Sequence, residues 1–222
     1  MSIQIQGFSG VVAEVDGTTY RALRVTIRPV DYGALGQYRL SLLTGTMAAG
    51  LAASSQIFQA RWTSTPQLAI VWGLSMDGFF GGTSAFTAGF ALFNLTIARV
   101  WTVDGSGGTS ATLTGNNQKL RTSMGTTLMG AIRIASTGAL GAGTSTLDGQ
   151  AEGQIAVSIG TVASVNYFGQ VGLYGASSLE DGGNPAPIVL AQNEGIVVRA
   201  SVPATGTWRT GVTMAWSEVA AY

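Results

Sequence analysis

The chain has 222 residues, of which 46% are hydrophobic and 10% are charged, and it contains 32 glycines. This apolar content is sufficient for the core of one folded domain and excludes an intrinsically disordered chain. Lys and Arg number 11, as do Asp and Glu, so the formal net charge is zero and the basic surface typical of nucleic-acid-binding proteins is absent. A neutral surface offers little resistance to association, which favours a protein that forms oligomers.

The missing residue types exclude much catalytic chemistry. The sequence contains no Cys and no His, which rules out thiol nucleophiles, disulfides, the usual zinc sites and Ser-His-Asp triads. Eleven acidic residues remain as candidates for paired carboxylates, but nearly all stand beside Gly or Asn, where acidic residues are common in turns. We therefore predict a protein that is not an enzyme and that has no cofactor and no metal site.

The sequence shows no targeting or spanning segment. The N-terminus lacks a basic stretch followed by an apolar one, so we expect no secretory signal and synthesis in a cytoplasm. Residues 78–98 are uncharged, but they alternate like a strand and are interrupted by polar residues, so they are not predicted to cross a membrane. Neither a membrane nor a nucleic acid is an expected partner.

Period-two alternation of apolar and polar residues, the pattern of half-buried strands, runs through the whole chain. The first predicted strand contains Arg21, Arg24 and Arg28, which we identify as candidate interface residues because arginine tolerates burial in interfaces. The five tryptophans all fall in strand-like runs and are expected in the core. The predicted strands are residues 21–28, 38–42, 58–62, 67–76, 90–103, 128–134, 154–159, 166–173, 188–191, 195–202 and 208–217.

Turn signals such as Asp-Gly separate these runs at spacings typical of an all-β sandwich or barrel. Many strands joined by loops of irregular length favour an antiparallel β-sandwich, and a jelly roll in particular. We predict a single sandwich domain over residues 20–222, with residues 1–19 as an N-terminal arm or an extra strand. Residues 136–149 are expected to form a loop, and the Ala-rich residues 48–55 a short helix.

Two further features bear on contact surfaces. Phe79 and Phe80 stand between glycines and are predicted to lie in a turn, where they either cap one end of the sandwich or insert into a neighbour. Charge is also uneven, since residues 1–61 carry +2 whereas the stretch between Arg133 and Arg199 holds five acids and no basic residue. The split indicates either opposed patches that set the register of an assembly or ordinary scatter of few charges.

Several blocks resemble proteins encoded in tailed-bacteriophage genomes, which are mostly uncharacterised or labelled as virion structural proteins. The blocks are residues 43–50, 112–126, 190–195, 202–208 and 215–218. The resemblance covers roughly the middle and C-terminal two thirds of the chain and carries no catalytic motif. Within that class a β-sandwich of this size resembles the capsid cement or decoration proteins, which are often trimers.

The resemblance implies a particle component on the head surface that binds across neighbouring subunits of the major capsid protein, or binds other virion proteins, as a homo-oligomer, with a trimer favoured. A second hypothesis is a tail or head-fibre module, a lectin-like sandwich that recognises a host glycan. A third, a carboxylate hydrolase, depends only on the presence of acidic residues.

Overall fold

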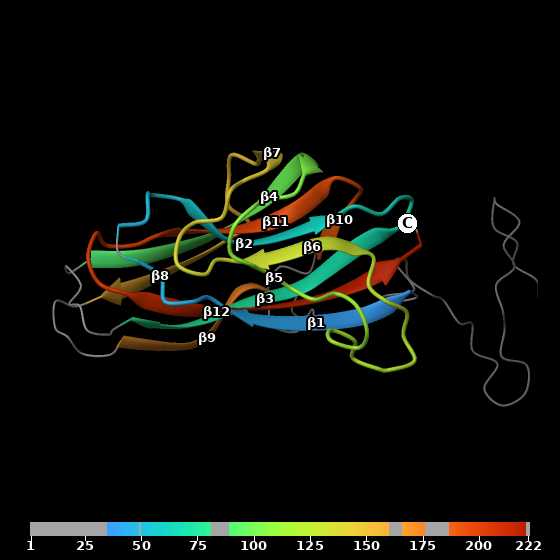
Figure 1. Ribbon diagram of the computed structural model, residues 1–222, viewed down its shortest axis with the longest axis horizontal. Coiled ribbons are helices and arrows are strands. Elements are labelled where there is room, and N and C mark those ends of the chain that lie inside the picture. Colours follow the sequence, from blue (N-terminus) through green and yellow to red (C-terminus); the bar gives the residue numbers. More distant parts are fainter. Residues whose placement is uncertain (1–34, 49, 81–88, 160–165, 176–186, 221–222) are drawn as a thin grey trace, which may run out of the picture. The chain divides into compact units, whose positions relative to one another are not determined.

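The computed structural model describes residues 35–48, 50–80, 89–159, 166–175 and 187–220. The predicted strand over residues 21–28 and the predicted arm lie outside these residues. Clustering of contacts separates residues 1–31, with Tyr222, from a unit formed by Tyr32–Ala221. The second unit is an all-β sandwich, in which every pair of neighbouring strands is antiparallel (Figure 1).

The described residues form twelve strands in two sheets. The five-stranded sheet has the order β1-β12-β3-β10, with β9 also paired to β3; its strands are β1 (Gly36–Leu43), β3 (Leu68–Phe80), β9 (Asn166–Gly175), β10 (Ile188–Leu190) and β12 (Trp208–Val219). The seven-stranded sheet has the order β5-β6-β2-β11-β4-β7, with β8 also paired to β4; its strands are β2 (Ser55–Trp62), β4 (Gly89–Val103), β5 (Thr109–Ser110), β6 (Met129–Ile134), β7 (Thr144–Leu147), β8 (Gly153–Ile159) and β11 (Glu194–Ser201).

Eight of these strands have the connectivity of a jelly roll. The chain alternates between the sheets from β1 to β4, places β8 beside β4, and alternates again through β9, β11 and β12. The resulting neighbour orders are β1-β12-β3-β9 and β2-β11-β4-β8, the two four-stranded sheets of a double Greek key. Strands β5 to β7 are an insertion between β4 and β8. The sandwich and its jelly-roll connectivity are therefore as predicted.

The core lies between the sheets because alternate residues of each strand point inward. Trp62, Trp208 and Trp216 are at most 1% exposed, and Phe93 of the seven-stranded sheet meets Trp208 of the other edge-to-face, with ring centroids 5.8 Å apart. Trp72 differs from the prediction, since it is only half-buried and its indole N–H donates to the Ser217 hydroxyl at 2.5 Å. The register shift that β3 makes against β12 in this region changes which side chains face the core.

One local prediction holds only in part and another is wrong. Residues 136–149 contain β7, which forms because β4 extends beyond β8 and offers a second pairing segment. The described residues of 48–55 contain no helix. Ala48 donates its backbone N–H to Thr137 at 3.0 Å, and Gly50 and Ser54 have φ of 72° and 61°, which a right-handed helix cannot accommodate. No helix among the described residues is long and apolar enough to span a membrane.

Candidate interaction surface

Of the five residues predicted to form an interface, Arg21, Arg24 and Arg28 lie outside the described residues. Phe79 and Phe80 do not form a turn, because they end β3 and their backbones pair with β12 on one side and β9 on the other. Pairing on both sides carries the strand past Gly78, which the sequence reading took as a turn signal. The side chains of both phenylalanines lie outside the described part of the chain, so the expected capping or insertion stays a prediction.

The two most exposed large apolar side chains among the described residues both lie on strand β4. They are Phe90 and Val100, which are 71% and 68% exposed, and Val103 of the same strand is 57% exposed. Val100 has a φ of 51°, which a β-branched residue rarely adopts, and it lies where the pairing between β4 and β7 shifts register. The bulge turns the end of β4 and directs Val100 into solvent. Strained backbone and exposed apolar side chains thus coincide on one strand.

Ion pairs hold the C-terminal end of β4, close to Val100. Arg99 binds Asp148 through Nε at 2.9 Å and Glu194 through Nη1 at 2.6 Å, and the pKa of its guanidinium is raised, chiefly by the hydrogen bond to Asp148. Arg61 reaches Asp104 at 2.6 Å. Strands β2, β4 and β11 and the segment after β7 are therefore joined by charged side chains around the bulge.

A small second hydrophobic cluster covers the outer face of the seven-stranded sheet beside this bulge. Ala98, Trp101 and Val197 are buried together, with Leu147 packed against them. A Cβ at Gly195 would lie 2.7 Å from the Trp101 ring, so only glycine leaves room for the indole to lie on the sheet. The Trp101 backbone N–H also donates to the Asn193 carbonyl at 2.8 Å. Trp101 is thus buried as predicted, but outside the core between the sheets.

Farther along the same outer face, polar groups are incompletely satisfied. Arg199 is half-buried and donates through Nη2 to the Thr96 hydroxyl at 2.9 Å, and within the described residues it has no acidic partner. Its Nε and Asn94 Oδ1 are both buried without a hydrogen-bond partner, and the two residues stand directly opposite each other on β11 and β4. Unsatisfied buried polar atoms are costly in a folded protein, so these two atoms require partners from water or from another molecule.

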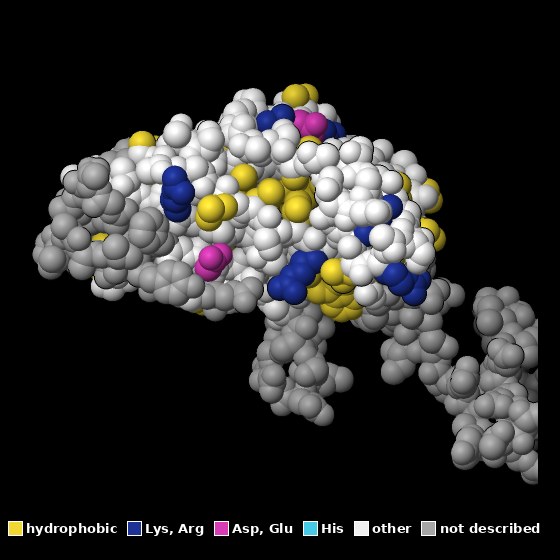
Figure 2. All heavy atoms as spheres, turned by 60° about the horizontal axis from the view of Figure 1, so that its bottom comes forward, with side chains coloured by type: hydrophobic (Ala, Val, Ile, Leu, Met, Phe, Trp, Pro, Cys, Tyr) yellow, Lys and Arg dark blue, Asp and Glu magenta, His cyan; other side chains and the backbone are white. Residues whose placement is uncertain are grey.

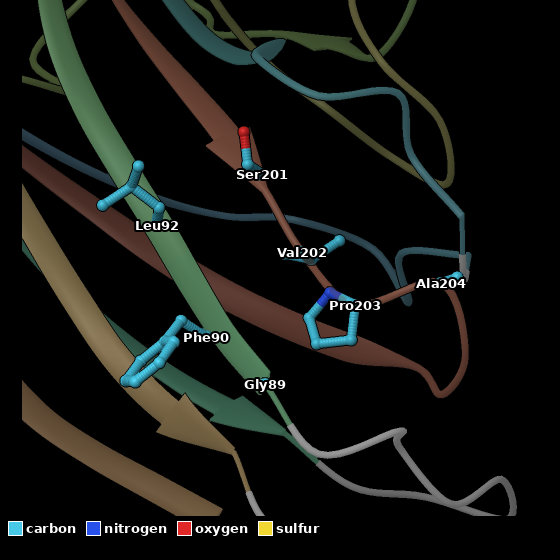
Figure 3. A pocket seen from close by; sticks show the side chains of 7 residues that line it. All are labelled: Gly89, Phe90, Leu92, Ser201, Val202, Pro203 and Ala204. Carbon is cyan, nitrogen blue, oxygen red and sulfur yellow. The ribbon is translucent and has the colours of Figure 1, made fainter.

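An open groove of about 280 Å³ lies two residues farther along these strands. Gly89, Phe90 and Leu92 of β4 form one wall, and Ser201 to Ala204, at and beyond the end of β11, form the other (Figure 3). The lining is mainly apolar, with the Ser201 hydroxyl as its polar side-chain group. Phe90 pairs with Ser158 of β8, so the groove adjoins the β8 edge of the sheet.

The opposite side of the sandwich is closed by the connection between β5 and β6, residues 111–128. The Arg39 N–H donates to the Gln118 carbonyl at 2.9 Å, and the Leu120 N–H donates to the Gln37 carbonyl at 3.3 Å. Gln118 is 1% exposed and its amide donates to the Leu113 carbonyl at 2.7 Å. This connection therefore links the seven-stranded sheet to the outer edge of β1.

Glu218 anchors the end of this connection. Its carboxylate is fully buried and accepts hydrogen bonds from the Thr127 hydroxyl, from the Leu128 N–H at 3.1 Å and from the Trp216 indole at 3.1 Å. Burial raises the pKa of Glu218, and these three donors partly oppose the rise. Burial, with the nearby Glu218 charge, raises the pKa of Tyr38 to about 12; Tyr38 stacks on Trp216. Glu218 thus departs from the expected role of acidic residues in turns.

Charged side chains elsewhere are few and separated on the face seen in Figure 2. The acidic stretch after Arg133 is not a free patch within the described residues, because Asp148 and Glu194 both pair with Arg99. In the same residues no group of three or more Asp, Glu, His or Cys is placed to hold a metal ion. The described acidic side chains thus serve mainly to fix loops and strands.

Comparison of the chain with protein-family models, with curated proteins and with solved structures found no match. The exposure of Phe90 does not follow from the sequence, because alternation over residues 90–103 predicts a strand but not which of its faces is covered. Arg199 gives no sequence signal either, because a lone arginine in an apolar strand forms no motif.

Proposed function

We propose that this chain is a non-enzymatic structural protein of a tailed-phage particle, a capsid cement protein that binds across neighbouring subunits of the head shell. The observation that carries the proposal is the set of exposed apolar side chains on β4, Phe90, Val100 and Val103, on a sheet whose fold is a jelly roll. Apolar side chains in ordered strands form the centre of protein interfaces, whereas isolated charges contribute little. The phage-like sequence blocks support the same assignment.

Arg199 and Asn94 add a polar component to this surface. Their unpartnered buried atoms lie beside the apolar groove, and a partner backbone can satisfy both, since Nε is a donor and Oδ1 an acceptor. Apolar contact with a few fixed polar groups is the usual composition of a specific interface. The seven-stranded sheet is accordingly the proposed contact face.

The test is binding to particles that lack this protein. Purified particles should contain the chain in a fixed ratio to the major capsid protein by quantitative mass spectrometry. The double variant Phe90→Ser/Val103→Ser should fold normally yet bind depleted particles at least roughly tenfold more weakly, because both side chains are exposed in the free protein. The matched control is Leu43→Ser, 61% exposed at the end of β1 in the other sheet. Absence of the chain from particles contradicts the proposal.

One observation favours the alternative, a head-fibre or tail module that binds a host glycan. Phe90 is an exposed aromatic ring beside an open groove, and aromatic faces are common platforms for sugar rings. Under this alternative the protein is confined to the tail or fibres at low copy number, and Phe90→Ala abolishes binding on a glycan array. Cryo-electron microscopy of intact particles distinguishes the two locations directly.

A further inference from the structure

The edge strands of the two sheets differ in how they are protected against pairing with another chain. Exposed edges of long, regular, uncharged strands invite such pairing, and proteins usually shorten, cover, charge or bulge them. Strands β5, β7 and β10 have two, four and three residues. Strand β1 is covered by backbone hydrogen bonds to the Gln118 carbonyl and from the Leu120 N–H, and the pairing of β9 with β3 shifts register twice. Each of these edges is therefore protected against pairing with another chain.

Strand β8 has none of these protections among the described residues. It runs for seven residues, Gly153–Ile159, without a charged residue or a proline, and its pairing with β4 is unbroken from end to end. Gln154, Ala156 and Ser158 are exposed on its outer face, whereas Ile155 and Ile159 are buried in the core. In the described residues β8 pairs with β4 alone. Alternate residues of an antiparallel strand therefore direct N–H and C=O groups away from β4 without a strand to receive them.

We propose that β8 pairs antiparallel with β8 of a second copy of this chain, so that two seven-stranded sheets join across a twofold axis. A second copy fits because the edge carries no charge, so that self-pairing creates no like-charge contact. This pairing is isologous, since each copy offers the same surface to the other. The inference goes beyond the proposed particle role and does not depend on it.

The register follows from the alternation of side chains. Residues facing each other across the axis must both point outward or both point inward, because a shift of one residue moves core side chains into solvent. Among the registers that satisfy this condition, all seven residues pair when Ala156 faces Ala156 of the second copy. Gln154 then faces Ser158, a pair that can hydrogen-bond, and Ile155 faces Val157. The outer and inner faces of the joined sheet remain continuous.

The test measures mass by light scattering during size-exclusion chromatography of the full chain over a range of concentrations. The wild-type chain should form a species with an even number of copies. Ala156→Lys and Ala156→Glu should each weaken this association by roughly tenfold, since each places two like charges face to face. An equimolar mixture of the two variants should restore it. The matched control Ser110→Lys, on the exposed edge strand β5 of the same sheet, should associate like the wild type.

Hydrogen exchange of the unmodified chain supplies a second readout. Protection of alternate β8 amides should increase with protein concentration, while protection in β2 should stay constant. A chain that is monomeric at every concentration overturns the proposal. So does an oligomer that tolerates both charge variants, or one in which β8 protection is independent of concentration.

Discussion

Glu218 shows what a buried carboxylate does to a β-sandwich. It lies on β12 with three hydrogen-bond donors around it and no cation among the described residues that could neutralise it. Burial therefore remains the dominant influence, and it raises the pKa of Glu218 above its ordinary value of 4.5. The folded state consequently binds this proton more tightly than the unfolded state.

We therefore expect Glu218 to make the free energy of unfolding depend on pH. Because the folded-state pKa is the higher one, stability from Glu218 is present below about pH 4.5 and is lost as the pH rises through the folded-state pKa. We predict that the free energy of unfolding of Glu218→Gln, relative to that of the wild type, increases from pH 4 to pH 8. Urea denaturation across this range measures the difference. A difference between Glu218→Gln and the wild type that stays constant across this range contradicts the prediction.

Val100 is a residue whose backbone conformation affects the stability of the protein. Its φ of 51° strains a β-branched side chain that is 68% exposed and contributes little packing. We predict that Val100→Gly stabilises the protein by about 1 kcal/mol, as relief of strain exceeds the entropy cost of glycine. Val103→Gly, at an exposed position without a positive φ, should destabilise it by about 0.5–1 kcal/mol. Thermal unfolding of both variants checks the opposite signs.

At the scale of elements, alternation located the long strands because each of them buries one face. In β12 the inward residues Trp208, Met214 and Trp216 are apolar and the pattern is unmistakable. Alternation does not predict the short strand β7, because Thr and Ser dominate it and because it forms by pairing with the second half of β4. Glu218 could have been located, since its parity with Trp216 places it on the buried face, but its residue type suggested a turn.

The candidate surface was less predictable than the fold. Exposure of Phe90 depends on which strand neighbours it, and β8 leaves that ring uncovered with only Ser158 directly opposite. Likewise, the hydrogen bonding of the Arg199 guanidinium depends on residues of another strand, and no local sequence pattern encodes these partners. The outcome for Arg21, Arg24 and Arg28 lies outside the described residues.

The connection over residues 111–128 protects the β1 edge by two backbone hydrogen bonds, one of which needs the Leu120 N–H. Leu120→Pro removes this donor and should cost about 1 kcal/mol and increase association through β1. Leu120→Ala keeps the donor and loses only a side chain that is 59% exposed, so its stability should match the wild type. Urea denaturation and light scattering separate the two variants. Equal behaviour of both contradicts the role of this hydrogen bond.

At the scale of the whole molecule, the sandwich has one closed and one open side. The connection over residues 111–128 joins the two sheets beside β1, whereas on the other side, bounded by β8 and β9, no second described strand pairs with β8.

The described residues form an extensive hydrophobic core. Its buried members range from Tyr38 to Trp216, and contact clustering assigns residues 1–31 to a separate unit. We predict that a chain starting at Tyr32 unfolds within a few degrees of the full chain's midpoint, in one cooperative transition, because the apolar area buried in the core is retained.

The same truncation should weaken assembly or particle binding, because it removes residues 1–19, the predicted arm. Circular dichroism with heating measures the first property, and light scattering and particle binding measure the second. Deletion of residues 1–16 alone should reproduce the loss of assembly without affecting the unfolding midpoint. If the chain that lacks residues 1–16 fails to fold, this segment contributes a strand to the core and the arm prediction is wrong.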